Sequence, residues 1–400
     1  MLRDLRLYLL LRFCGALAMQ VQIVAIGWQV YDIAHDPFAL GYVGLAQFLA
    51  MVVVVLPAGD AADRIDRRRI MFGVYLLQST ASAFLLYLTF TGTHALWPFF
   101  TVAALFGVGQ AFSGPAMQSL LPFLVTPEVL PRAVAWSSSM WQIATIAGPA
   151  LGGGLYYFGL SADYAVALAL FLASAAGITQ LHLRRSAGGA PVGTTLERVA
   201  EGIRYVRKKQ ILLGAISLDL FAVLFGGATA LLPIYARDIL EVGAGGLGLM
   251  RSAPAVGATL VAFALSRWPL TRHVGAKMFA CVAAFGLATI VFGFSQNFFL
   301  SLAALALLGA ADQVSVVVRS TLVQLATPDA MRGRVSAVNF LFIGTSNELG
   351  EFESGVVAGL LGVVRSVVLG GVGTLLVVGG WLKLFPQLRK IDRFTDAMPP

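Results

Sequence analysis

Long apolar runs alternate with short polar segments along the whole chain of 400 residues. A helix that crosses the hydrocarbon core of a bilayer needs about 20 mostly apolar residues. A window of that length predicts twelve membrane-spanning helices, over residues 11–31, 40–59, 70–91, 96–124, 133–158, 163–183, 211–235, 246–266, 276–295, 298–326, 334–361 and 364–385. Windows 96–124 and 298–326 are long, so we expect these helices to tilt or to extend beyond the bilayer. The pattern predicts an all-α membrane protein.

Composition excludes the other broad classes. Charged residues make up 12% of the chain and hydrophobic residues 58%, whereas about 25% of an ordinary soluble domain is charged. This chain lacks the polar surface that a soluble, fibrous or disordered protein needs. Its two cysteines, Cys14 and Cys281, both lie in apolar runs and exclude a disulfide scaffold. The first twelve residues are basic and lead into an apolar run without a small-residue cleavage site, so we expect an uncleaved first span.

The basic residues are distributed unevenly between the two sides of the predicted spans. If the N-terminus is cytoplasmic, 24 of the 28 Lys and Arg residues fall in cytoplasmic segments. Cytoplasmic loops of membrane proteins carry such an excess, so we expect both termini inside, in a bacterial inner membrane. The net charge of +8 then reflects topology, and we expect no nucleic-acid partner.

The longest loop divides the predicted spans into two sets of six. We predict an N-terminal six-helix bundle over 1–183, a cytoplasmic interdomain loop over 184–210, a C-terminal six-helix bundle over 211–385 and a cytoplasmic tail over 386–400. Thr194 and Glu197 have the spacing of a capping box at a helix start. The apolar stripe that follows predicts an amphipathic helix on the membrane surface, formed by Leu196, Val199, Ile203 and Val206.

The two halves resemble each other at an offset of about 201–202 residues. A Thr-Pro-acid segment, residues 126–128, follows the fourth span, and its counterpart, residues 327–329, follows the tenth span. Recurrence at equivalent points predicts two bundles related by a pseudo-two-fold axis along the membrane normal.

A glycine and several charges follow the second span at a characteristic spacing. The segment resembles the loop signature of the major facilitator superfamily at Gly59, Asp63, Arg64, Arg67 and Arg68, while Asp66 occupies the place of a second glycine. From the residues alone, Gly59 predicts a tight turn. The resemblance covers nearly the whole chain and implies two six-helix bundles that transport a solute by alternating access. It also implies that this loop, with Glu128 and Arg132, forms a cytoplasmic gate. The equivalent loop of the second half is degenerate.

A small-residue motif lies in the fifth span. Gly148, Pro149, Gly152 and Gly153 resemble the antiporter signature of the superfamily, which implies export in exchange for protons. Small residues also permit close helix packing, and a proline removes a helical hydrogen bond. The fourth span contains Gly107 and Gly109 but lacks the arginine that family exporters often carry before them.

Charges inside a membrane are costly and are usually functional. We place them all in the second half, and predict that proton coupling uses Asp312, Glu348 and Glu351, with Arg319 as the counter-charge. Asp312 and Arg319 are two turns apart and share a helix face. Glu353 lies on a different face from Glu348. By resemblance, the substrate cavity is lined by Asp219 and by four residues of the first half, Gln22, Trp28, Gln29 and Gln110.

A stretch that runs from the end of the tenth span into the eleventh resembles the exporter branch that includes enterobactin exporters and macrolide efflux proteins. It comprises residues 326–339 and Ser346–Phe352. We therefore expect proton-coupled export of a small organic molecule, a siderophore or a drug-like compound. The acidic residues of this span leave movement of a metal ion or metal chelate open as an alternative, and facilitated import is another.

The sequence disfavours other functions. It contains no phosphate-binding loop ending in Gly-Lys-Ser/Thr, and its four histidines are scattered without metal-ligand spacing. We expect no enzymatic activity, no cofactor and no bound metal. The expected partners are a small-molecule substrate, protons and membrane lipids, and we expect a monomer.

Overall fold

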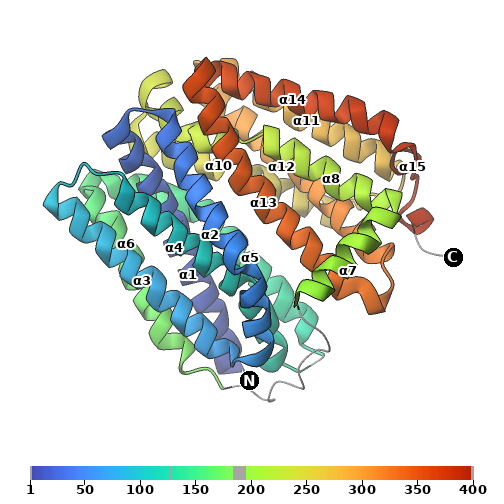
Figure 1. Ribbon diagram of the computed structural model, residues 1–400, viewed down its shortest axis with the longest axis horizontal. Helices are drawn as coiled ribbons and strands as arrows, with labels where there is room; N and C mark the ends of the chain where they lie inside the picture. The colour runs from blue at the N-terminus through green and yellow to red at the C-terminus, as the bar shows by residue number, and fades with distance from the viewer. Residues whose placement is uncertain (1, 127, 183–194, 398–400) are drawn as a thin grey trace. The chain divides into compact units, whose positions relative to one another are not determined.

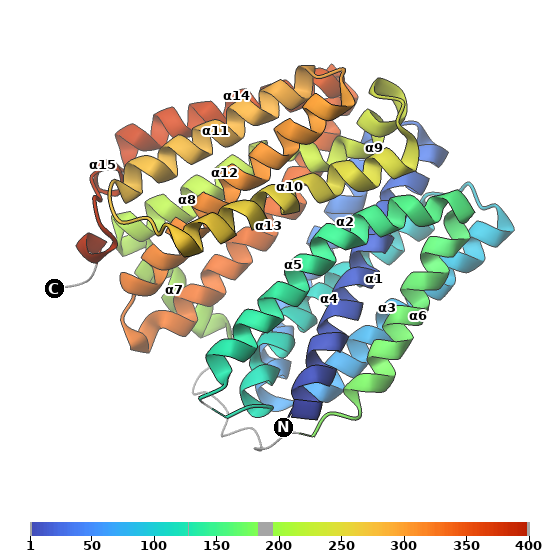
Figure 2. The same cartoon turned by 180° about the vertical axis from the view of Figure 1, so that it is seen from behind.

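The computed structural model describes residues 2–126, 128–182 and 195–397, and within these ranges the chain forms helices and no strands (Figures 1 and 2). The predicted all-α fold is confirmed. Each predicted span coincides with a long helix: α1 (Leu2–Ala34), α2 (Pro37–Arg64), α3 (Arg67–Thr91), α4 (Trp97–Leu120), α5 (Leu130–Leu155), α6 (Leu160–Ile178), α8 (Gln210–Phe225), α10 (Gly243–Arg267), α11 (Val274–Phe294), α12 (Phe298–Leu325), α13 (Asp329–Leu361) and α14 (Val363–Leu384).

Shorter elements connect or extend these helices. The seventh span continues beyond α8 through the turn η3 (Ala228–Leu231), α9 (Leu232–Ile234) and the π-helical turn η4 (Tyr235–Ile239). The others are η1 (Leu121–Phe123), η2 (Tyr156–Phe158), α7 (Thr195–Lys208), α15 (Pro386–Arg389) and η5 (Phe394–Ala397). Within the described ranges, ten helical segments are long and apolar enough to cross a membrane, and α5 and α13 are not among them.

The chain divides into two compact units. Unit 1 comprises Met1–His35, Tyr42–Thr195 and Val242–Ser252, and unit 2 comprises Asp36–Gly41, Leu196–Glu241 and Ala253–Pro400. In unit 1, α1 packs along α5 and α6, and α3 packs along α4 and α6. In unit 2, α8 packs along α13 and α14, and α11 packs along α12 and α14. The packing partners therefore correspond helix by helix, as the internal repeat predicts.

Two glycines occupy equivalent positions in this repeat. Gly159 precedes α6 with φ 96° and ψ 153°, and Gly362 precedes α14 with φ 92° and ψ 151°. Residues with a side chain rarely adopt this conformation, so glycine is required at both turns. The match sets the local offset between the halves at 203 residues, the difference between these two positions.

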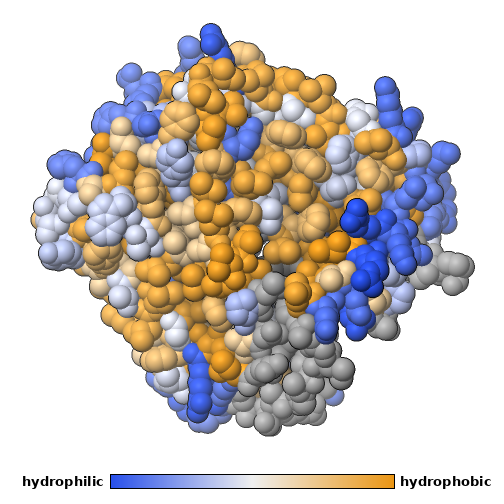
Figure 3. All heavy atoms as spheres, in the orientation of Figure 1, coloured by the Kyte–Doolittle hydropathy of each residue, from blue (hydrophilic) through white to orange (hydrophobic). Residues whose placement is uncertain are grey.

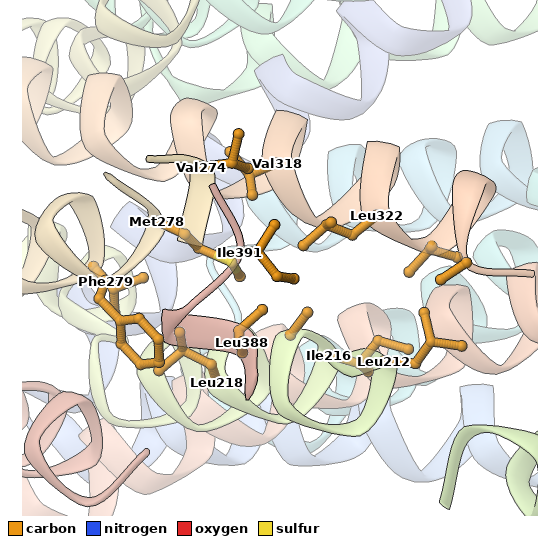
Figure 4. Close-up of a cluster of buried hydrophobic side chains, with 14 of the residues drawn as sticks. Leu212, Ile216, Leu218, Val274, Met278, Phe279, Val318, Leu322, Leu388 and Ile391 are labelled. Carbon is orange, nitrogen blue, oxygen red and sulfur yellow. The ribbon is translucent and has the colours of Figure 1, made fainter. Parts of the chain in front are cut away.

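The core of unit 2 includes part of the predicted tail. Leu388 of α15 and the nearby Ile391 are buried among Leu212 of α8, Met278 of α11 and Leu322 of α12 (Figure 4). The backbone amides of Val274 and Gly275 donate hydrogen bonds to the carbonyl oxygens of Asp392 and Ile391. Burial of large apolar side chains stabilises such an attachment. Residues 386–397 are thus an ordered part of unit 2.

The amphipathic helix α7 also packs on unit 2, which corrects the expectation that its apolar stripe lies on the membrane surface. Val206 is buried in the core, with Val199 and Ile203 against it, whereas Leu196 is exposed. The close approach of α7 to α13 depends on Gly202, because a Cβ there would lie 2.6 Å from the carbonyl oxygen of Arg334. The capping position Thr194 lies outside the described residues.

Many large apolar side chains remain exposed on the long helices. Figure 3 shows hydrophobic residues spread over much of one face. Examples are Val53 of α2, Phe90 of α3, Phe263 of α10 and Leu376 of α14, each at least 63% exposed. Helices that present such side chains outward are suited to lipid, where all their backbone groups are satisfied internally.

Candidate functional site

A buried ion pair joins two helices of unit 2. Nη1 of Arg319, on α12, lies 3.2 Å from Oδ2 of Asp219, on α8. The same nitrogen donates a hydrogen bond of 3.1 Å to Oδ1 of Asn339, on α13. The side chains of Arg319 and Asp219 are 4% and 6% exposed. A charged pair removed from water in this way is costly to assemble, and its geometry matters.

A second carboxyl group lies beside this pair. Asp312 of α12 lines a small cavity together with Asp219, Ser315 and the apolar residues Val282 and Phe285. Within the described ranges, Arg319 forms its ion pair with Asp219 and none with Asp312, and its role as the counter-charge in proton coupling stays a prediction. Two carboxyl groups therefore share the neighbourhood of one guanidinium, so that both cannot ionise without a net negative charge in the interior.

The acidic residues of α13 lie elsewhere in unit 2. Glu348 is 7% exposed, and Glu351 and Glu353 are half-buried. None of the three lines the cavity beside Asp312. Gly350, between them, lies against the carbonyl oxygens of Val223 and Leu224 and allows α13 to approach α8 closely. The structure therefore brings Asp219, Asp312 and Arg319 together, but not Glu348 or Glu351 with them.

The first-half residues predicted to line a substrate cavity lie in unit 1, whereas Asp219 lies in unit 2. Gln22 Oε1 accepts a hydrogen bond from Ser82, and Gln110 Oε1 accepts one from Gln47. Gln29 Oε1 accepts a hydrogen bond from Tyr164, and Gln29 Nε2 donates one to Thr89. Trp28 packs its ring edge-on to Tyr156, and its buried Nε1 has no hydrogen-bond partner. Their role in substrate binding stays a prediction.

Sequence reasoning missed a buried acid in the first half. Asp163, in the first turn of α6, is 1% exposed, and its buried Oδ1 has no hydrogen-bond partner. The expectation that every membrane charge lies in the second half is therefore wrong. The signal was present, because Asp163 is the only charged residue of the apolar stretch Leu160–Ile178, but the predicted span began at that residue.

The segment between α2 and α3 is stabilised by local contacts of unit 1. Gly59 lies inside α2, so the predicted tight turn there is wrong. Asp66, in the place of the second glycine, caps α3 with a carboxylate that accepts a hydrogen bond from the Arg68 amide. The hydrogen-bonded Arg68 side chain also lowers the pKa of Asp66. Because Asp66 has φ −57°, no glycine is needed there.

The arginines of this segment contact the ends of neighbouring helices. Arg67 Nε donates to Ser119 Oγ at 3.0 Å, and its guanidinium lies 4.6 Å from the centroid of the Phe123 ring. Arg68 Nη1 donates to the carbonyl oxygen of Leu181 at 2.9 Å. The side chains of Asp63 and Arg64 lie outside the described residues.

The remaining predicted gate residues, Glu128 and Arg132, are both exposed. The hydroxyl of Thr126 hydrogen-bonds to Glu128 and lowers the pKa of its carboxyl. The contacts of Arg67 and Arg68 join the segment to α4 and to the residues that follow α6, and a gating role stays a prediction.

The glycines of the fifth-span motif lie where neighbouring backbones approach. A Cβ on Gly148 would lie 2.5 Å from Cβ of Gln20, and one on Gly152 would lie 3.2 Å from the carbonyl oxygen of Val21, both on α1. A Cβ on Gly153 would lie 2.5 Å from the carbonyl oxygen of Ala244, in the part of α10 that belongs to unit 1. Pro149 lies within α5. The motif therefore serves helix packing at least.

Among the described residues, no group of three or more His, Cys, Asp or Glu side chains lies close enough together to hold a metal ion.

The arrangement of helices is the major facilitator fold. Solved structures with the same fold include a bacterial homologue of the iron transporter ferroportin, at a TM-score of 0.72 and 17% identity, covering 98% of this chain and 100% of that one. The nucleoside transporter NupG matches at a TM-score of 0.70 and 15% identity, covering 96% and 99% of the two chains.

The chain belongs to the family of transmembrane secretion effectors within the major facilitator superfamily, whose sequence profile matches residues 6–399. An uncharacterised MFS-type transporter of Bacillus subtilis, YvqJ, is 26% identical over 374 residues, which cover 88% of this chain and 86% of YvqJ. The enterobactin exporter EntS of Citrobacter koseri is 25% identical over 407 residues, covering 98% of this chain and 94% of EntS. The predicted family resemblance is confirmed, and the protein is a multi-pass membrane transporter.

Proposed function

We propose that this transporter exports a small organic molecule, a siderophore or a drug-like compound, in exchange for protons by alternating access. The observation that carries the coupling is the buried group formed by Asp219, Arg319 and Asp312 on α8 and α12. One guanidinium stabilises one carboxylate, so the second carboxyl is the group that gains and loses a proton when the cavity meets water.

The direction and the cargo rest on similarity. The motif around Pro149 resembles an antiporter signature, and the relatives include enterobactin exporters. We further propose that the protein lies in a bacterial inner membrane with both termini cytoplasmic, because basic residues are concentrated in the loops on that side. It would work as a monomer with lipid, substrate and protons as its partners.

The other predicted residues take supporting roles in this proposal. Gly59, Asp63, Arg64, Arg67, Arg68, Glu128 and Arg132 form a cytoplasmic gate, and Gln22, Trp28, Gln29 and Gln110 contribute to the substrate cavity. Glu348 and Glu351 are secondary candidates for proton binding, because Glu348 is buried and Glu351 is half-buried on α13.

Transport into proteoliposomes with an imposed pH gradient tests the coupling. The cargo is first chosen by a thermal-shift screen that includes enterobactin as a catecholate siderophore, dye-like drugs and divalent metal ions alone. We expect an organic compound to raise the melting temperature without metal. A shift caused by metal ions alone, and abolished by Glu348→Gln or Glu351→Gln, would instead support metal transport.

The variant Asp312→Asn removes the proposed proton site and keeps its shape. We expect it to bind cargo but to lose the response of transport to the pH gradient. Asp238→Asn, at an exposed aspartate of unit 2, is the matched control. Gradient-driven transport that persists in Asp312→Asn would refute the coupling assignment.

A further inference from the structure

Asp163 is a buried acid that the proposed coupling group does not use. It lies in unit 1 on α6, four residues after Gly159, where α6 begins. Four residues correspond to about 6 Å along a helix, so the carboxyl lies about one turn inside this end of α6. The adjoining residues Tyr157 and Phe158 of η2 are 83% and 81% exposed. Exposed aromatic residues at a helix end are typical of the membrane interface.

The carboxyl group of Asp163 has no cation to balance a charge. Among the described residues, no Arg, Lys or His forms an ion pair with it, and its buried Oδ1 accepts no hydrogen bond. The next residue, Tyr164, donates its hydroxyl to Gln29 Oε1 at 2.7 Å and not to Asp163. An ionised carboxylate in such surroundings loses its hydration without compensation.

Four other titratable side chains lie near this end of α6, on the elements that pack against it, and none of them is a partner of the Asp163 carboxyl. They are Tyr31 and Asp32 of α1, Tyr87 of α3 and Tyr156 of η2. None of them forms a hydrogen bond or ion pair with Asp163 in the described structure. The adjoining Tyr164 is itself fully buried.

The internal repeat shows which chemical group suits this position. At the offset of 203 residues that relates Gly159 to Gly362, Asp163 corresponds to Ser366. Ser366 is buried in the first turn of α14, and its neutral hydroxyl donates a hydrogen bond of 3.0 Å to the carbonyl oxygen of Ser354, on α13. A protonated carboxyl resembles that hydroxyl because it also presents an O–H donor, whereas a carboxylate only accepts.

We propose that Asp163 is a second proton-binding residue of the transporter, separate from the group in unit 2, which stays protonated while it is buried. Its proton is released to water when this end of α1, η2 and α6 opens during the transport cycle. The inference uses the transporter fold but not the coupling role of Asp312, and the measurement below needs no substrate.

Infrared spectroscopy of the purified protein in lipid nanodiscs detects the neutral carboxyl directly. Wild type should show a C=O stretching band of a protonated aspartic acid at pH 7, which Asp163→Asn removes and the exposed-site control Asp32→Asn keeps. Asp312→Asn removes only the infrared contribution of Asp312. Failure of the coupling proposal for Asp312 and failure of the proposal for Asp163 are therefore distinguishable. Identical carboxyl bands in wild type and Asp163→Asn between pH 5 and 9 would overturn the proposal.

Thermal unfolding gives a second readout that a merely structural aspartate would not move. The folded protein holds a proton that the unfolded chain releases above about pH 4. The melting temperature of wild type should therefore fall relative to Asp163→Asn as the pH rises from about 5 to 8. Parallel curves would show an ionised residue that only stabilises the start of α6, and would contradict the proposal.

A variant that fails to fold does not end the test. In protein labelled with ¹³C at aspartate carboxyls, Asp163→Glu returns one carboxyl band to its unlabelled frequency if this position is protonated. Absence of that band from folded, labelled Asp163→Glu overturns the proposal.

Discussion

Replacing Arg319 by methionine would leave the Asp219 carboxylate buried without its cation. The two side chains are only 4% and 6% exposed, so water does not replace the lost contact, and Asn339 offers an amide in place of a charge. Removal of one partner from a buried ion pair costs about 3–5 kcal/mol. For a folded unit of 150–250 residues, about 1 kcal/mol corresponds to a shift of roughly 2–4 °C, which predicts a loss on the order of 10 °C.

The double variant Asp219→Asn with Arg319→Met tests the reasoning more sharply. It removes both charges, so we expect a melting temperature well above that of either single variant, with a coupling of about 1–3 kcal/mol. The assay is thermal unfolding in detergent, followed by intrinsic fluorescence. Arg365→Met makes the same side-chain change at an exposed site of α14 and should leave the melting temperature nearly unchanged. Additive losses in the double variant would refute the ion pair as the cause.

Three further predictions concern packing, capping and docking. In α5, Gly148→Ala should destabilise the protein by about 1–3 kcal/mol, because the added Cβ meets the base of the Gln20 side chain. The added Cβ of Gly154→Ala meets no atom within 4 Å, so this variant should be neutral or stabilise by up to about 1 kcal/mol through helix propensity. Equal shifts of the melting temperature in the two variants would contradict this. At the α3 cap, Asp66→Asn should lower the melting temperature slightly at pH 7. Because Arg68 lowers the pKa of Asp66, the stabilisation is present above about pH 4 and is lost as the pH falls, so a difference that grows in acid would disprove it. On α7, Gly202→Leu should release the helix from α13 and speed tryptic cleavage at Arg204 and Arg207. The control Glu201→Gln should have little effect, because the ion pair of Glu201 with Arg334 is more than a third exposed. Faster cleavage in Glu201→Gln alone would show that charge, not packing, holds α7 on α13.

Local pattern was sufficient to place the long helices, because most predicted spans are apolar runs bounded by polar residues. The predicted window 276–295 and the observed α11, Val274–Phe294, differ by two residues or fewer. The sequence also predicted the twofold repeat, because the Thr-Pro-acid segments and glycines recur at equivalent positions of the two halves. The turn predicted at Gly59 was wrong. Asp66 caps α3 through its side chain, and Gly59 continues α2, which a signature of residue types does not distinguish.

Which charged side chains are buried, and which groups they contact, could be read only from the tertiary structure. Spacing along α12 put Asp312 and Arg319 on one face, but the cation pairs with Asp219 of another helix, about 100 positions away in the chain. Asp163 looked like the polar edge of a span and proved to be 1% exposed.

The sequence by itself determined the class of protein and the positions of its long helices, because hydrophobic length and periodicity are local properties of the chain. The tertiary structure decided which acid meets the arginine, that α7 and residues 386–397 pack on unit 2, and that Asp163 is buried without a counter-charge. Those outcomes depend on which helix faces meet, and contacts between distant segments leave no periodic trace in the sequence.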